Sequence, residues 1–277
     1  MNLEELKSMA GDIRVDIVKM VAEAGSGHPG GSLSAADIMC ALYFGGVLKH
    51  DAENPKAEDR DRFLLSKGHA APALYATLAE AGYFPKEELA TLRKLHSRLQ
   101  GHPDCRKLPG VEASTGSLGQ GLSIAAGMAL GLKLNGSESS VFTLMGDGEC
   151  QEGQVWEAAM FAAHKGLDSL VAIVDHNHLQ IDGRIETVCS PEDLGDKFRS
   201  FGWQVFQCDG NDMEAILATL ESAKESRSGK PCVIVAETTK GKGVSFMEDQ
   251  AGWHGKAPNA EQTEQALAEL TANKEAK

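Results

Sequence analysis

Residues 141–149 read VFTLMGDGE, and this stretch decides the fold. A short, mostly apolar run that ends in a turn signal is typical of a parallel strand buried on both faces. Gly146 and Gly148 flank Asp147, and glycine allows the backbone to approach another group closely. We therefore predict a buried strand over residues 141–145, with Asp147 at its carboxyl end.

The rest of the chain alternates similar runs with helical patterns. Further strands are predicted at residues 62–65, 170–175, 204–207 and 232–237. Helices are predicted at residues 3–24, 34–44, 71–81, 118–134, 154–164, 213–226 and 260–274. Ser34 and Asp37 resemble a capping box, which places a helix start at Ser34. Strands alternating with helices predict an α/β fold, a parallel sheet with helices on both faces.

We expect a single domain over residues 1–277, because no internal repeat or low-complexity tract divides the chain. Its last part, residues 259–277, is expected to be a C-terminal helix that is polar on most faces.

Composition restricts the classes of partner and compartment. Lys and Arg total 27 against 40 Asp and Glu, a net charge of −13. Such a surface repels nucleic acid and anionic membranes, so neither is an expected partner. We find no targeting signal and no run of about 18 apolar residues, so no membrane span is expected. The six cysteines form no C-x-x-C pair, which favours free thiols in the cytoplasm and argues against a zinc site.

Asp147 and Asn177 each follow a predicted strand, and 28 residues separate Gly148 from Asn177. The carboxyl ends of parallel strands meet at one edge of the sheet, where ligands bind. Carboxylate and amide oxygens there suit Mg²⁺, which is often shared with substrate phosphates. The alternative is a simple glycine turn at Asp147 and a strand cap at Asn177. The spacing and both strand contexts favour the metal site.

Glycine-rich segments supply further candidates. Residues 116–121, GSLGQG, begin a helix whose free amides and positive end favour an anion, although small residues also permit close helix–sheet packing. Four histidines lie beside glycine in predicted loops: His28, His69, His102 and His254. Imidazoles suit proton transfer near neutral pH. Zinc ligation is the competing use, but no i,i+4 pair or cysteine partner supports it.

The remaining five histidines are interpreted as structural or surface residues. They are His50, His96, His164, His176 and His178.

Several motifs occur in one order along the chain: S-G-H-P-G-G, S-K-G-H, Q-G-H-P, T-G-S-L-G-Q-G, G-D-G-E-x-Q-E-G and D-x-N-x-x-Q-I-D-G. Together they resemble transketolases over residues 3–258. The resemblance implies the thiamin-diphosphate-binding fold (PP domain), with thiamine diphosphate and Mg²⁺ as cofactors, or Ca²⁺ or Mn²⁺ in place of Mg²⁺.

The same resemblance implies the roles of individual residues. The implied metal ligands are Asp147, Asn177 and the main-chain carbonyl of Leu179. The implied cofactor contacts are His69, Gly116, Leu118, Gly148, Glu152, Asn177 and His254. The implied catalytic residues, which would transfer protons to and from the donor's hydroxyl groups, are His28, His102 and His254. Glu152 and Glu157 would lie at a contact between subunits.

The chain departs from the family in its length, because transketolases usually carry a second domain with the catalytic glutamate and the sugar-phosphate arginines. The resemblance therefore implies the N-terminal, diphosphate-binding subunit of a split transketolase (EC 2.2.1.1-like). Such a subunit is active only with a separate pyrimidine-binding, C-terminal transketolase subunit, in a heterotetramer that acts on sugar phosphates in the pentose phosphate pathway.

Three alternatives stay open. Two of them are enzymes: a 1-deoxyxylulose-5-phosphate synthase, which shares some of these motifs, and a split ketol transferase for another sugar. The third is a non-catalytic scaffold homologue, but a scaffold has no physical need for Asp147, Asn177, His28, His69 and His102.

Overall fold

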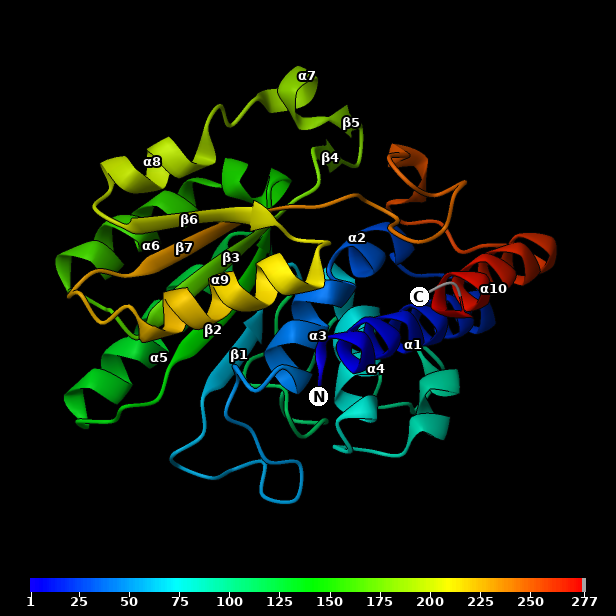
Figure 1. Ribbon diagram of the computed structural model, residues 1–277, viewed down its shortest axis with the longest axis horizontal. Helices are drawn as coiled ribbons and strands as arrows, with labels where there is room; N and C mark the ends of the chain where they lie inside the picture. Colours follow the sequence, from blue (N-terminus) through cyan, green and yellow to red (C-terminus); the bar gives the residue numbers. More distant parts are fainter. Residues whose placement is uncertain (276–277) are drawn as a thin grey trace.

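The protein is described by a computed structural model that covers residues 1–275 (Figure 1). Its centre is a five-stranded sheet in the order β1-β2-β3-β7-β6, and every neighbouring pair is parallel. The strands are β1 (Arg62–Leu65), β2 (Val141–Gly146), β3 (Leu170–His176), β6 (Gln204–Asp209) and β7 (Cys232–Glu237). The predicted strands are therefore all present, and the predicted α/β fold with a parallel sheet is confirmed.

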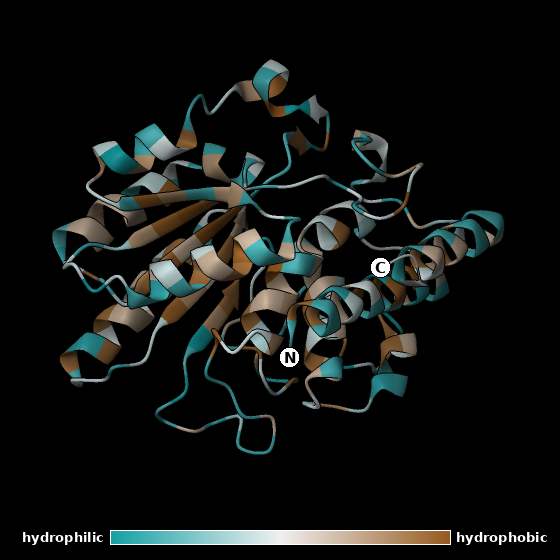
Figure 2. Ribbon diagram, in the orientation of Figure 1, coloured by the Kyte–Doolittle hydropathy of each residue, from teal (hydrophilic) through white to brown (hydrophobic). Residues whose placement is uncertain are grey.

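The central strands β2, β3 and β7 are mostly apolar, as Figure 2 shows by their brown ribbons, whereas the edge strand β6 is partly hydrophilic. Alternate residues of one strand enter different cores: Phe142 and Leu144 pack into one, and Val141 and Met145 into the other. Since both faces of the central strands are covered, they read as continuous apolar runs in the sequence.

Helices cover the two faces separately. One face is packed by α1 (Leu3–Ala24), α3 (Ala36–Phe44), α4 (Ala71–Glu80) and α9 (Met213–Glu225). The other face is packed by α5 (Gln120–Leu134), α6 (Gly153–His164) and α8 (Leu194–Ser200). The shorter elements are α2 (Pro29–Ser34), α7 (Ile185–Cys189), β4 (Leu179–Gln180), β5 (Gly183–Arg184), η1 (Gly68–Ala70), η2 (Lys86–Thr91), η3 (Gly148–Gln151) and η4 (Ala251–Trp253).

The predicted helix start at Ser34 is wrong. Residues up to Ser34 belong to α2, and α3 begins at Ala36 without a side-chain cap. The Ser34 hydroxyl donates instead to Asp175 Oδ2 at 2.6 Å, and Asp37 Oδ1 accepts from Arg14 Nη1 at 3.0 Å. Buried polar groups elsewhere in the fold therefore use both side chains that a capping box requires.

The last helix, α10 (Ala260–Glu275), lies against α1 (Figure 1). Its outer faces are polar, but Ala266 and Leu270 are buried in the core that α1 shares. Residues 276–277 of the predicted helix lie outside the described residues. Within the described part of the chain, no helix combines the length and apolar character needed to cross a membrane.

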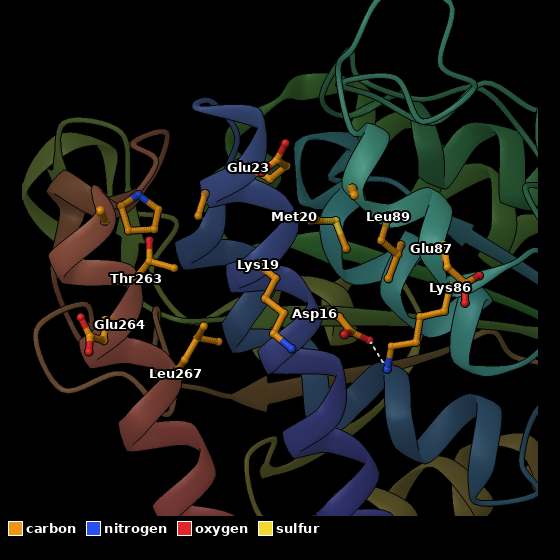
Figure 3. A pocket seen from close by; sticks show the side chains of 14 residues that line it. Asp16, Lys19, Met20, Glu23, Lys86, Glu87, Leu89, Thr263, Glu264 and Leu267 are labelled. Carbon is orange, nitrogen blue, oxygen red and sulfur yellow. Dashed lines mark ion pairs between the residues drawn. The ribbon is translucent and has the colours of Figure 1, made fainter.

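A cavity of about 920 Å³ opens between α1, η2 and α10 (Figure 3). Its charged lining includes Lys86, whose amine pairs with Asp16 Oδ2 at 2.9 Å. No motif of the sequence lies in this cavity. The motifs meet in a different place, at the carboxyl edge of the sheet.

Candidate functional site

A cavity of about 300 Å³ lies at the carboxyl edge of the sheet. Lys67 follows β1, Asp147 follows β2, Asn177 follows β3 and Lys240 lies beyond β7, and all four line it. In Figure 1 the strand arrowheads point toward the side on which α2, β4 and β5 lie. The parallel sheet therefore brings four separate segments to one place.

The structure gathers almost all of the predicted site residues around this cavity. The lining includes His28, His69, Gly116, Leu118, Asp147, Gly148, Glu152, Asn177, Leu179 and His254. His102 is outside the lining, but its imidazole packs against Gly116: a Cβ added to that glycine would lie 3.0 Å from His102 Cδ2. Glu152 and Glu157 are both exposed. The roles of these residues remain predictions.

Asp147 is buried, and main-chain amides hold its carboxylate. Oδ1 accepts from Gly148 N at 2.7 Å, and Oδ2 accepts from His178 N at 2.6 Å. Burial, together with the negative charge of Asp175, raises the pKa of Asp147 to about 6. Among the described residues no cationic side chain is bonded to this carboxylate, so it retains lone pairs for a bound cation.

Asn177 is also buried beside this cavity. Its Oδ1 accepts from Leu179 N at 3.2 Å, and its Nδ2 donates to Asp175 Oδ2 at 3.1 Å. These bonds hold the amide so that its oxygen stays on the side of Leu179. Asp147 and Asn177 therefore present oxygens from neighbouring strand ends, the donor set that suits a hard divalent cation.

Two buried lysines complete the site, and neither was assigned a role from the sequence. Lys240 Nζ donates to the main-chain oxygen of Leu179 at 3.0 Å and to His254 Nδ1 at 3.0 Å. Burial lowers the pKa of Lys240 to about 8. The amine therefore occupies a position beside the carbonyl that was predicted to bind a metal.

Lys67 Nζ donates to the main-chain oxygen of Gly31 at 2.8 Å and forms an ion pair with Asp175. Burial by itself would raise the pKa of Asp175, but Lys67 and the hydroxyls of Ser34 and Thr238 hold that pKa below its usual range. The useful signal in the sequence was a lysine beside glycine just after a strand end, at Lys67 and again at Lys240.

Three imidazoles from separate loops form a cluster. The ring centroids of His28 and His69 are 5.3 Å apart, those of His28 and His254 5.4 Å, and those of His69 and His254 5.1 Å. Burial is the main cause that lowers their pKa values, to about 4 for His28, about 2 for His69 and about 3 for His254, and nearby lysines contribute. Near pH 7 the cluster is therefore neutral.

The lowered pKa of His69 predicts a pH effect on stability. Below the ordinary histidine pKa of about 6.5, the unfolded chain binds a proton at this position and the folded chain does not. The folded state therefore loses stability as the pH falls. His69→Gln removes this loss, worth about 2 kcal/mol at about pH 5, or roughly 4–8 °C in Tm. We expect a smaller drop in Tm between pH 8 and pH 5, measured by calorimetry. His164→Gln, outside the cavity, is the control, and an unchanged drop in His69→Gln contradicts the prediction.

Glu149 holds the loops around the cavity in position. Its Oε1 accepts from Gly119 N at 3.0 Å and from the Ser66 hydroxyl, and its Oε2 accepts from Gly146 N at 3.0 Å. One buried carboxylate therefore joins the ends of β1 and β2 to the start of α5. This role was not predicted from the sequence.

The residues present fit a diphosphate bound together with a divalent cation. A Cβ added to Gly31 would lie 3.6 Å from both His69 Nε2 and Lys67 Nζ, so a side chain there would fill the space between donor groups. Among the described residues, His28 Nδ1 and Gln180 Nε2 are buried with no hydrogen-bond partner, and both residues line the cavity. Amines and imidazoles suit the anion, and the oxygens of Asp147 and Asn177 suit the cation.

Known proteins are similar to this chain in sequence and in fold. Residues 6–277 match the family described as "Transketolase, thiamine diphosphate binding domain". The 6-deoxy-6-sulfo-D-fructose transketolase subunit SqwG of Clostridium sp. (strain MSTE9) is 45% identical over 266 residues, covering 96% of each chain. An apulose-4-phosphate transketolase subunit of Phocaeicola vulgatus is 43% identical over 271 residues, covering 98% of this chain and 95% of that protein.

Solved structures of longer chains are similar to this chain in fold and in sequence. The transketolase of Campylobacter jejuni superimposes with a TM-score of 0.91 at 36% identity, covering 98% of this chain but 43% of that one. A Pichia stipitis transketolase complex with sedoheptulose-7-phosphate gives a TM-score of 0.89 at 32% identity, with 99% and 44% coverage. The chain therefore spans less than half of those transketolases and almost all of the proteins named as subunits.

Proposed function

Since the chain belongs to the transketolase family and matches its thiamine-diphosphate-binding domain, we propose that it is the N-terminal, diphosphate-binding subunit of a split transketolase. With a pyrimidine-binding partner it transfers a two-carbon ketol unit from a ketose to an aldose. The chain serves as one domain, which ends in its described part with the helix α10 (Ala260–Glu275). The free cysteines support a place in the cytoplasm, where thiols stay reduced.

The observation that carries this proposal is the single cavity shared by Asp147, Asn177 and the imidazole cluster. Asp147 and Asn177 would hold Mg²⁺, and His69 and Gly148 would contact the diphosphate. Gly116 and Leu118 would lie near the pyrimidine. Bound thiamine diphosphate supplies the electron sink that permits the carbon–carbon bond beside a carbonyl to break.

The protein's own part in the reaction is to position sugar hydroxyls and move their protons. Below the lowered pKa of Lys240, about 8, its ammonium donates to His254 Nδ1, so the proton of that neutral ring sits on Nε2. His254 therefore presents a donor. His28 Nδ1 is buried with no partner among the described residues, so no bond to them at this nitrogen fixes the tautomer of the ring, and we assign His28 the role of proton acceptor. His102, whose ring packs against Gly116, would act on the same hydroxyls.

A partner subunit is supported by exposed apolar side chains, one of which lines the cavity. Ile181, which lines the cavity, is 67% exposed. On α5 and α6, Leu134, Met160 and Phe161 are exposed as well, although large apolar side chains are more often buried. A partner that covers Ile181 would also cover Glu152, which lines the same cavity. We propose a heterotetramer of two such pairs.

We propose only the chemical class of the donor sugar. Two relatives are named for a sulfo-fructose and for apulose-4-phosphate, both ketoses with an anionic group. A phosphorylated or sulfonated ketose is therefore the proposed donor, and pentose phosphates belong to this class. These names favour ketol transfer over a 1-deoxyxylulose-5-phosphate synthase activity.

A donor panel tests the activity. The complex of this chain with its partner, supplied with thiamine diphosphate and Mg²⁺, is mixed with phosphorylated and sulfonated ketoses and an aldose phosphate acceptor. We expect at least one donor to lose two carbons to the acceptor, with both products identified by mass spectrometry. Cofactor-loaded complex that transfers nothing from any donor contradicts the proposal.

A further inference from the structure

A second group of metal-ligating side chains lies at the ends of β3 and β7, and two of its members flank Asn177 in the chain. His176 Nδ1 lies 2.7 Å from Glu237 Oε1, and His178 Nε2 lies 2.9 Å from Glu237 Oε2. One ligand atom from each of these three side chains lies within 4.8 Å of the others. Both imidazoles thus meet the two oxygens of one carboxylate.

The fold places these residues together in two ways. The parallel register pairs His176 of β3 with Glu237 of β7, so their side chains share one face at the strand ends. His178 has a φ of +62°, a left-handed conformation that is uncommon for residues other than glycine. Its ring lies against His176, with centroids 4.1 Å apart. The backbone therefore adopts a conformation of about 1 kcal/mol cost that gathers the two rings.

The second nitrogen of His178 is also engaged. Its Nδ1 lies 2.7 Å from Glu186 Oε1, while Nε2 faces the shared position. A carboxylate that accepts the remaining N–H of a ligating imidazole fixes the tautomer and the ring orientation of that ligand. Glu186 is placed to do this for His178.

We infer that His176, His178 and Glu237 form a second cation site, which takes a borderline-soft divalent ion such as Zn²⁺. Two imidazole nitrogens and one carboxylate leave a fourth position for water, the arrangement of an open zinc site. Mg²⁺ is not suited to it, because that ion prefers oxygen ligands in an octahedron. The two sites thus differ in the chemistry of their ligands as well as in the residues that form them.

From the sequence, these histidines were assigned to structural or surface roles. The two histidines are two residues apart, which is not a helical ligand spacing, and Glu237 lies 59 residues beyond His178. Only the pairing of β3 with β7 brings the third ligand to the pair.

The site also connects to the first cavity through the backbone. His178 N donates to Asp147 Oδ2 at 2.6 Å, and Asn177 lies between the two histidines in the chain. An ion bound by the imidazoles would hold this strand end in one conformation, so we expect it to raise the Tm of the chain.

Metal titration of the full chain tests the inference without thiamine diphosphate, so its outcome is independent of the proposed function. Chain stripped with a chelator is titrated with Co²⁺, whose visible absorption reports four-coordinate binding. We expect one Co²⁺ per chain, displaced by Zn²⁺ but not by excess Mg²⁺. Absence of stoichiometric Co²⁺ binding overturns the inference, and the cluster is then an ion-paired surface group only.

Matched variants assign the ligands. His178→Asn keeps a residue type that tolerates the left-handed backbone, and we expect it, like His176→Asn and Glu237→Gln, to weaken Co²⁺ binding by about 100-fold or more. Glu186→Gln removes only the orienting carboxylate, so we expect a loss of about 10-fold. The control is His96→Asn, because His96 is exposed and also has a positive φ, of +66°. Co²⁺ binding that survives His178→Asn in a folded variant rejects the assignment.

Discussion

The isolated chain is expected to show no measurable ketol transfer, and adding the C-terminal partner should raise the rate by about 10⁴-fold or more. A single missing proton-transfer group accounts for about 10²–10⁴-fold in rate. Here the loss is compounded, because Ile181 and Glu152 at the cavity rim are exposed in this chain and water reaches the reacting groups. The measurement is a ketol-transfer assay of the chain alone, the partner alone and the pair.

A surface variant separates failed assembly from failed chemistry. Met160→Lys places a charge on the exposed apolar side of α6, where Met160 is 58% exposed, and should prevent the pair from forming without unfolding the chain. Leu95→Lys is the matched control, since Leu95 is more exposed still and lies outside α5 and α6. Sedimentation measures the complex, and the activity of each mixture should follow the amount of complex. Ketol transfer by the pure isolated chain would refute the split-enzyme proposal.

Asp147→Asn should weaken the Mg²⁺-dependent binding of thiamine diphosphate by about 100-fold or more. Substituting residues that only support metal ligands costs about 10–100-fold in metal affinity, and a direct ligand is expected to cost at least as much. The amide keeps one oxygen to accept from Gly148 N, but its nitrogen cannot accept from His178 N, so the charge and one of the two hydrogen bonds are removed together. Calorimetric titration with the cofactor, with and without Mg²⁺, measures the effect.

The stability of the same variant distinguishes a lost ligand from a damaged fold. Asp147 is 2% exposed and has no cationic side chain bonded to it among the described residues, so its charge is costly in the apo chain. The bond that His178 N loses offsets this gain, so we expect the apo variant to melt close to the wild-type Tm. Asp59→Asn, the same change at an exposed aspartate, should leave cofactor binding unchanged. Mg²⁺-dependent binding that persists in Asp147→Asn argues against the assigned metal ligand.

The local pattern of apolar residues was enough to predict the fold and one edge of the site. Buried parallel strands need apolar residues on both faces, so the apolar run before Asp147 and the other apolar runs could be predicted as strands from the sequence. The bounds of each predicted strand lie within two residues of the observed bounds. Because parallel strands end on the same side, the approach of Asp147 to Asn177 also followed from the sequence.

The partners of the buried charges were decided by tertiary structure. Lys67 pairs with Asp175, 108 residues away, and Lys240 reaches Leu179 O across 61 residues. The Ser34 hydroxyl, which was expected to cap a helix, donates instead to the same buried carboxylate of Asp175.

The sequence by itself therefore determined the alternation of strands and helices and the placing of the motifs at strand ends. Only the tertiary structure decided which nitrogen faces which oxygen, including the pairing of His176 and His178 with Glu237. The reason is that hydrophobic periodicity is a local property of the chain. A buried polar group, in contrast, must bond to whatever partner the packing of distant segments brings within about 3 Å.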